Sequence, residues 1–227
     1  MNRNQIPSAL ATAFPFFENL PAADRELLCD NSLPVCFARD TRIHDASECT
    51  GVMLVLSGSL RVYMLSESGK EITLYRLFAG EVCMLSASCV LDSITFDVHV
   101  DAEEDSECIR IGSAAFAEVS ERIPEMKIFA LESALNRFSG VMWTMQQILF
   151  MPFSRRLAVF LLDELARTGG DTVKLTHEQI AKYMGSAREV VTRQLRLFAD
   201  DGLVRASRSE GIRILDKKRL RHLTVEH

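Results

Sequence analysis

The chain has 227 residues, enough for one large domain or two ordinary ones, and 48% of them are hydrophobic, enough to bury a core. No run of about 18 apolar residues occurs, and the start has no basic region followed by an apolar stretch, so we expect neither a membrane span nor a secretory signal. These features predict a soluble, cytoplasmic protein without membrane contact. The six cysteines include no CxxC pair, so neither a disulfide framework nor a metal site is expected.

The net charge of −5 is an average over two very different parts. Residues 1–148 carry 11 Lys and Arg against 21 Asp and Glu, a net charge of −10, whereas residues 149–227 carry 15 against 10, a net charge of +5. A basic C-terminal third beside an acidic remainder is typical of a phosphate-binding module joined to a separate module. Chance segregation of charge is the alternative.

The first two thirds of the chain predict a short helical entry followed by β-structure. Residues 14–30 have helical apolar spacing after Pro21. Residues 52–111 contain short runs rich in Val, Ile, Leu, Phe and Tyr, separated by turn residues such as Gly58 and Gly80, which predicts a sandwich or roll. Within them, Phe96, Val98, Val100 and Ala102 alternate with Thr95, Asp97, His99 and Asp101, so one face should be buried and the other should meet water or a ligand.

A long helix with one apolar seam is predicted next. The seam follows a regular 3,4 spacing at Ile128, Leu131, Leu135, Phe138, Met142, Met145 and Leu149. Such a seam usually faces another helix, so we expect dimerisation along it; packing on its own domain is the alternative. Met151 and Pro152 then end the helix, because proline lacks a backbone donor and clashes with the preceding turn.

Residues 176–202 have the spacing of a helix-turn-helix. Thr176 with Gln179, and Ser186 with Glu189, form two successive capping-box patterns, each of which predicts a helix start. Gly185 lies between the two helices, where the turn requires unusual dihedral angles. After Gly202, the segment LVRASRSEGIRIL predicts a β-hairpin wing.

The second of these helices carries polar side chains away from its apolar face, as a recognition helix does. Arginine suits guanine O6 and N7, and a carboxylate can accept from cytosine N4, so these side chains match the major groove; a merely solvated face is the alternative. Arginines of the wing would lie near phosphates. The predicted contacts to double-stranded DNA are made by Thr176, Ser186, Arg188, Glu189, Thr192, Arg193, Arg196, Arg205, Arg208 and Arg213.

The segments VLSGSLRVYMLSESGKEITLYRLFAGEV and GSAREVVTRQLRLFADDGLV, in this order, resemble the Crp/Fnr family of bacterial transcription regulators over nearly the whole chain. The resemblance implies an α+β fold: a cyclic-nucleotide-binding-type β-roll (a double-stranded β-helix) at 1–122, a dimerisation helix at 123–150 and a winged helix-turn-helix at 151–227. It implies a homodimer that responds to an effector, binds inverted-repeat DNA and contacts RNA polymerase. It also places Arg188, Glu189 and Arg193 at base-contacting positions. The combination of Arg188 and Thr192 mixes features of the cAMP receptor branch and the Fnr branch of the family.

The effector end departs from the family pattern. In the cyclic-nucleotide binders of this fold, a Gly-Glu pair is followed by an Arg-Ser or Arg-Ala pair that holds the cyclic phosphate. Here the Gly-Glu pair is Gly80 and Glu81, but the chain has no arginine between Arg76 and Arg110. A phosphate there would meet carboxylates without a cation, so cAMP is not the expected effector. The predicted pocket for another small molecule comprises Tyr63, Leu74, Gly80, Glu81, Cys83, Cys89, Phe96, Val98, Val141 and Met142.

Several alternatives stay open at this end of the chain. Cys29, Cys36 and Cys49 are too widely spaced for the iron-sulfur cluster of the Fnr type, so no cluster is expected. Haem, with an axial ligand among His44, His99, Cys83 and Cys89, or no cofactor at all, would fit the sequence. Cys83 and Cys89 could form a thiol switch, and a constitutive DNA-binding protein would look the same. A thiol enzyme is not expected, because no cysteine has an activating neighbour in a known motif.

Overall fold

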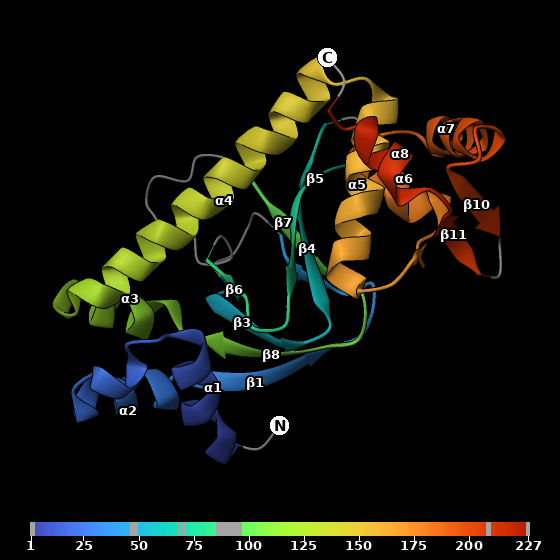
Figure 1. Cartoon of the computed structure of the whole chain (residues 1–227). Helices are drawn as coiled ribbons and strands as arrows, with labels where there is room; N and C mark the ends of the chain where they lie inside the picture. Colours follow the sequence, from blue (N-terminus) through green and yellow to red (C-terminus); the bar gives the residue numbers. More distant parts are fainter. Residues whose placement is uncertain are drawn as a thin grey trace. The chain divides into compact units, whose positions relative to one another are not determined.

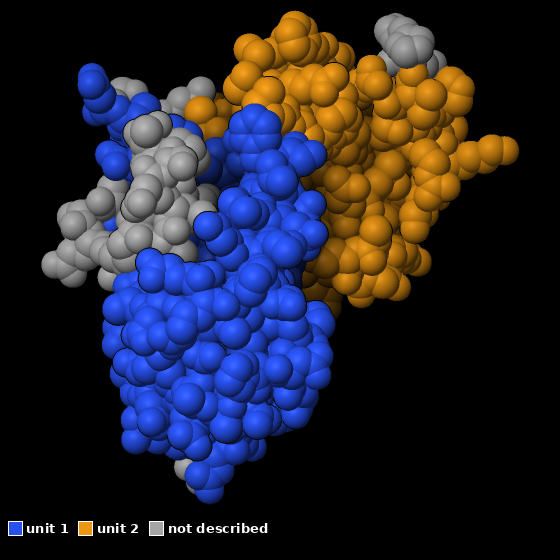
Figure 2. Space-filling model, turned by 90° about the vertical axis from the view of Figure 1, so that its left-hand side faces the viewer, with its two compact units in different colours: residues 1–69, 74–141 blue, residues 70–73, 142–227 orange. Residues whose placement is uncertain are grey.

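The computed structural model describes residues 3–45, 50–67, 69, 71–84, 97–207 and 210–225. The chain divides into two compact units, drawn in blue and orange in Figure 2. Unit 1 comprises residues 1–69 and 74–141, and unit 2 comprises residues 70–73 and 142–227. Each unit has its own hydrophobic core.

Unit 1 begins with helices that cover one side of a sheet (Figure 1). These are η1 (Arg3–Gln5), α1 (Ile6–Ala13), η2 (Phe17–Asn19) and α2 (Ala22–Asp30). The sequence predicted the helix after Pro21, which is the N-cap of α2, but it did not predict α1. Phe14 packs against Phe116 of α3 (Ser113–Arg122), with ring centres 6.2 Å apart. The helices therefore share an aromatic core.

The β-roll contains two four-stranded sheets among the described residues. One has the order β1-β8-β3-β6, formed by Ser32–Phe37, Ser106–Ile111, Val52–Ser57 and Val82–Cys83. The other has the order β2-β7-β4-β5, formed by Arg42–His44, His99–Ala102, Ser59–Leu65 and Glu71–Phe78. Met53 and Val55 of β3 join the core inside the roll, while Val52 and Leu54 pack toward the helices. This alternation is the two-residue period of a strand.

The expected alternation near residue 100 is confirmed where the chain is described. Val98, Val100 and Ala102 are buried in the roll, whereas Asp97 is exposed. Their neighbours Thr95 and Phe96 lie outside the described residues. The sequence pattern therefore identified the correct inner face of β7.

The predicted long helix is confirmed as α4 (Pro124–Phe150), which runs unbroken through 27 residues. Its first part, to Val141, belongs to unit 1, and its remainder belongs to unit 2. Met126 and Ala130 are buried against the helical core of unit 1. Pro152 is the N-cap of the next helix, as the break in the sequence predicted.

Unit 2 is a three-stranded sheet with four further helices in the described part of the chain. They are α5 (Phe153–Thr168), α6 (His177–Met184), α7 (Arg188–Asp200) and α8 (Lys217–His222). The sheet has the order β10-β11-β9, formed by Val204–Ser207, Gly211–Ile214 and Thr172–Val173. The hairpin of β10 and β11 was predicted, but β9, the third strand of the sheet, was not. Gly211 has a φ of +92°, and a Cβ there would lie 2.5 Å from the carbonyl oxygen of Val173, so only glycine fits beside β9.

Candidate nucleic-acid interface

The first helix of the helix-turn-helix begins with the predicted capping box. The Thr176 hydroxyl accepts a hydrogen bond of 3.1 Å from the backbone N–H of Gln179, whose side chain accepts one of 2.9 Å from the backbone N–H of Thr176. Two of the amide donors at the start of α6 are thereby satisfied. Thr176 is exposed, but its hydroxyl is engaged in this cap.

The second helix does not begin as predicted. The N-cap of α7 is Ala187, which makes no side-chain cap, so the proposed capping box of Ser186 with Glu189 is wrong. Ser186 instead belongs to the turn, where its backbone N–H donates to the carbonyl of Ala181 at 2.9 Å. Gly185 ends α6 with a φ of +59°, the left-handed conformation that the sequence predicted for this glycine. The turn is thus held by backbone bonds.

The outer face of α7 is basic and exposed. Val191, Leu195 and Phe198 are buried in the core of unit 2. The charged residues predicted to contact DNA project away from that core and are exposed: Arg188, Glu189, Arg193 and Arg196. The arrangement offers guanidinium groups, one carboxylate and a helix N-terminus on one face, which is the chemistry that a duplex groove and its phosphates require.

Thr192, the remaining predicted contact on α7, is half-buried and bonded to a residue that sequence reasoning missed. Its Oγ1 lies 2.9 Å from Nδ1 of His177, the first residue of α6, and donates to the carbonyl oxygen of Arg188 at 2.9 Å. Burial and the nearby positive charge of Arg188 lower the pKa of His177. A neutral imidazole therefore lies beside Thr192 of α7.

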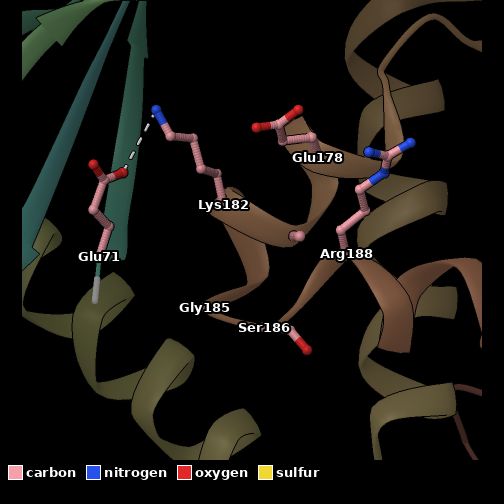
Figure 3. Close-up of a pocket in the computed structure, with 7 residues that line it drawn as sticks. Glu71, Glu178, Lys182, Gly185, Ser186 and Arg188 are labelled. Atoms are coloured by element: carbon pink, nitrogen blue, oxygen red, sulfur yellow. Dashed lines mark ion pairs between the residues drawn. The ribbon is translucent and has the colours of Figure 1, made fainter. Parts of the chain in front are cut away.

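A pocket of about 250 Å³ lies at the turn between α6 and α7 (Figure 3). The side chains of Lys182 and Arg188 border it together with Glu71, which belongs to the segment 70–73 of unit 2. The Lys182 Nζ is 3.6 Å from Oε2 of Glu71, and the Thr73 hydroxyl donates to the Lys182 carbonyl at 3.0 Å. The pocket therefore combines two cations with two carboxylates, those of Glu71 and Glu178.

The wing carries two of its three predicted arginines in the described part of the chain. Arg205 and Arg213 are exposed and directly opposite each other across β10 and β11. Arg213 Nε pairs with Asp171 at 3.0 Å, and a hydrogen bond from Thr172 together with Arg213 lowers the pKa of that carboxyl. Arg208 lies outside the described residues.

Other basic residues of unit 2 were not predicted to act at this interface. Arg156 of α5 donates from Nη2 to the carbonyl of Met184 at 2.6 Å, which fixes the end of α6, and burial lowers its pKa. The helix α8 has the sequence KKRLRH. This run of basic residues is the sequence feature that could have indicated a further basic surface. Its Arg219 donates to the carbonyl of Asp201, just after α7, at 3.1 Å.

The residues predicted for an effector pocket are only partly brought together. Leu74, Cys83 and Val98 are buried in the core of the roll, and Val141 of α4 packs against it. Gly80 has a φ of +88° in the turn before Glu81. Cys89 and Phe96 lie outside the described residues, and Met142 is exposed.

Tyr63 lies elsewhere. It is opposite His99 across β4 and β7, and its hydroxyl accepts from Nη2 of Arg42 at 2.6 Å. The guanidinium of Arg61 lies 4.1 Å from its ring centre. Leu60 and Val62 of β4, whose side chains point to the opposite face of the strand from that of Tyr63, belong to the roll core, whereas Tyr63 does not. Tyr63 is therefore not on the face that encloses that core.

Sequence reasoning missed a cation beside the Gly-Glu pair. Arg137, on α4, donates from Nη2 to Oε1 of Glu81 at 3.0 Å, and its guanidinium lies 4.9 Å from the ring centre of Tyr75. Oε2 of Glu81 accepts from the backbone N–H of Phe78 at 2.8 Å. Burial, with the neighbouring Cys83 thiol, raises the pKa of Tyr75, so its phenol stays protonated. No nearby sequence position signals Arg137, because it lies 56 residues after Glu81.

The candidate redox and haem residues show no metal-binding cluster in the described part of the chain. Burial raises the pKa of Cys108 to about 12, so this thiol stays protonated. The ring of His44 bonds to the Thr50 hydroxyl at 2.6 Å, and the His99 ring packs beside Tyr63. The proposed Cys83 and Cys89 pair extends beyond the described residues.

The seam of α4 is exposed in the single chain. Its seven predicted residues are between 42% and 66% exposed, and Trp143, Ile148 and Phe150 extend the apolar surface. None of the described helices is both long and apolar enough to span a bilayer.

Known proteins share both parts of this architecture. A cyclic nucleotide-binding domain profile matches residues 37–122, and a Crp-like helix-turn-helix profile matches residues 155–223. A crystal structure of a Crp/Fnr-family protein from Eubacterium rectale is 42% identical, with a TM-score of 0.87 over 94% of this chain and 99% of that one. The cAMP-activated global transcriptional regulator CRP of Haemophilus influenzae is 23% identical over 74% of this chain and 78% of its own. The cAMP-activated regulator Vfr of Pseudomonas aeruginosa is 24% identical over 74% and 82%. The chain therefore belongs to the Crp/Fnr family of DNA-binding transcription regulators.

Proposed function

We propose that the chain acts as a homodimer that binds an inverted-repeat DNA site with one α7 helix in each half-site, under the control of an effector other than cAMP. The observation that carries this proposal is the exposed face of α7, where Arg188, Glu189 and Arg193 lie in the opening turns of a helix anchored by the core of unit 2. The N-terminal turns of a recognition helix are those that reach base edges.

The charge of the chain supports a nucleic-acid partner. The net charge of +5 is confined to residues 149–227, and the exposed arginines of α7 and of the wing lie within that segment. Contacts to phosphates position the protein and make its affinity fall with salt, whereas contacts to base edges supply the specificity. We assign Arg188, Glu189 and Arg193 to base edges and Arg205 and Arg213 to phosphates.

The exposed seam of α4 supports the homodimer. An exposed apolar stripe of seven side chains is costly in water, and its 3,4 spacing fits a second parallel copy of the same helix. A twofold pair would hold two recognition helices at half-sites about one helical turn apart. RNA polymerase is the further partner that family membership suggests.

The effector is proposed to bind in the roll beside α4, where ligand binding would change how α4 packs. The relatives from Haemophilus influenzae and Pseudomonas aeruginosa are described as cAMP-activated. In this chain, the sequence after Glu81 lacks the arginine that holds a cyclic phosphate in such proteins. Arg137 is engaged with Glu81 instead, so we infer a different small molecule.

The test of the DNA-binding proposal is footprinting of the purified chain on the region upstream of its own gene and the neighbouring genes. We expect a protected inverted repeat. Arg188→Ala should relax specificity at one base pair per half-site, at a cost of about 1–3 kcal/mol for the preferred base. Arg205→Ala and Arg208→Ala should each weaken binding to all sequences alike. Protection without sequence preference would contradict the proposal.

The effector proposal has separate tests. Titration calorimetry with cAMP should show no tight binding, and an affinity in the micromolar range would contradict it. A visible absorption spectrum of the purified protein tests for haem, and a thiol titration tests for a reactive cysteine. A Soret band would replace the small-molecule proposal with a haem-based sensor.

A further inference from the structure

His177, the first residue of α6, lies beside the recognition helix with one of its two ring nitrogens open to solvent. Its ring is half-buried, and Nδ1 lies 2.9 Å from Oγ1 of Thr192 on α7. Nε2 has no hydrogen-bond partner among the described residues and is not a buried atom, unlike the unpartnered Nδ1 of His99. Because the two nitrogens lie on different sides of the ring, Nε2 is directed away from Thr192 and is available to a ligand.

The start of α6 offers backbone donors on the same turn. The capping box uses the backbone N–H groups of Thr176 and Gln179. Those of His177 and Glu178 lie between them and take no part in the cap, so they are among the donors that the start of a helix leaves open. The partial positive charge of a helix N-terminus also favours an anion. An imidazole nitrogen and open backbone donors thus occur within one turn.

The charged groups around the ring come from both helices and from β5. Burial and the nearby positive charge of Arg188 lower the pKa of His177. Glu178, the next residue of α6, lines the pocket with Arg188 and Lys182, and Glu71 of β5 pairs with Lys182. Neither carboxylate is hydrogen-bonded to the ring, whose one such partner in the described part of the chain is Thr192. The ring of the free chain is therefore neutral at neutral pH.

Bound DNA would reverse this balance. In a helix-turn-helix, the second helix enters the major groove and the first crosses the sugar-phosphate backbone. With α7 in a groove, the first turn of α6 therefore meets the backbone. A phosphate within hydrogen-bond distance of Nε2 stabilises the imidazolium and offsets the positive charge of Arg188. The imidazolium donates from both nitrogens, so the contact with Thr192 is kept in either charge state.

We propose that His177 contacts a backbone phosphate of bound DNA through Nε2 and that its ring takes up one proton from solvent as this contact forms. The proposal rests on the proposed DNA-binding function and adds a regulation to it, because proton uptake makes DNA affinity rise as the pH falls. In this arrangement Thr192 orients the ring, and Nε2 carries the contact.

The experiment measures the affinity of the full-length chain for two duplexes by fluorescence anisotropy between pH 7.5 and pH 6.0. One duplex contains the footprinted site and the other has a scrambled sequence. His177→Gln places an amide near the position of Nε2 but cannot be protonated, whereas His177→Arg carries a permanent positive charge. His222→Gln is the matched control, because it removes an exposed imidazole from α8 of the same unit.

The affinity of the wild type for both duplexes should rise at least about fivefold over this range, and that of His222→Gln should rise alike. The affinity of His177→Gln should change less than about twofold. His177→Arg should bind tightly at both ends of the range, and its salt slope should exceed that of His177→Gln by about one unit per protomer. An NMR titration of the wild-type imidazole should show a higher pKa of His177 in the complex than in the free chain.

The inference is wrong if His177→Gln keeps the pH dependence of the wild type, or if DNA leaves the pKa of His177 unchanged. A pH dependence confined to the footprinted site would also overturn it, since it would indicate a base contact. The NMR measurement needs no variant, so it decides the matter even if His177→Gln does not fold. If the wild type binds both duplexes equally, the proposed sequence-specific function fails, while proton uptake on the scrambled duplex still tests the phosphate contact.

Discussion

Arg137 and Glu81 form an ion pair of 3.0 Å that links α4 to the turn following β5. Both side chains are only partly exposed, at 28% and 36%. The guanidinium also stacks on the ring of Tyr75, so its position is fixed from two directions. Within unit 1, the pair is therefore a direct connection between the long helix and the roll.

Replacing this arginine should weaken unit 1 modestly. Arg137→Met keeps most of the side-chain volume but leaves Glu81 without its cation, so we expect a loss of about 1 kcal/mol or less in the free energy of unfolding, since solvent screens the pair. Urea unfolding followed by circular dichroism measures it. Arg110→Met, at an exposed position of β8, is the control and should change little. Equal effects of the two variants would mean that the ion pair contributes nothing.

A charge placed on the exposed seam of α4 should prevent dimerisation. Leu135 is 66% exposed in the single chain, so Leu135→Glu should leave the fold intact while it repels the second copy. Analytical ultracentrifugation should then show monomers, and the affinity for a complete inverted repeat should fall by more than tenfold as the second half-site is lost. Asn136→Glu adds the same charge at the next exposed position, away from the seam, and should remain dimeric. A dimeric Leu135→Glu would rule out this interface.

The pKa of His177 predicts how stability changes with pH. Burial and the charge of Arg188 lower this pKa in the folded chain, so the unfolded chain takes up a proton first as the pH falls through its usual value near 6.5. The stability contributed by the neutral ring is thus fully present above that value and is lost as the pH falls toward the folded pKa. The urea midpoint of the wild type should drop more than that of His177→Asn between pH 7.5 and pH 5.5. Parallel midpoints would show that the pKa is not lowered.

Removing the Glu71 carboxylate, one of two in the pocket beside α7, should strengthen DNA binding. Glu71 is 3.6 Å from Lys182 and borders the same pocket as Arg188, so it competes with phosphates for these cations. Glu71→Gln should raise DNA affinity a few-fold at low salt, with a smaller gain at high salt as the charges are screened. Glu67→Gln makes the same change in net charge at an exposed position and should have less effect. Identical gains in both variants would indicate a general charge effect.

Short sequence patterns predicted the start of a helix correctly where their side chains form hydrogen bonds to the backbone of that helix. The capping box at Thr176 was correct because its residues bond to the amides that start α6. The same pattern at Ser186 failed because α7 begins one residue later than this pattern predicts, with Ala187 as its N-cap. A capping pattern shows only that the side chains are able to form a cap. Here Ser186 lies in the turn, and Ala187 is the N-cap instead.

The parts of the site that depend on distant contacts could not be predicted. Arg137 reaches Glu81 from a helix 56 residues away, and His177 reaches Thr192 across the turn between α6 and α7. Neither pairing has a spacing rule. The short strand β9 was missed for the same reason, because two residues carry no period and exist as a strand only beside β11.

The glycine at position 211 determines how the wing could vary among related proteins. The backbone of Val173 occupies the space of any side chain at this position, and the next two residues of β11, Ile212 and Arg213, pair with β9. Residues added between Ser207 and Gly211 would therefore lengthen only the loop of the hairpin and would leave the pairing of β11 with β9 unchanged. The length of the wing is thus adjustable by simple insertion, independently of α7.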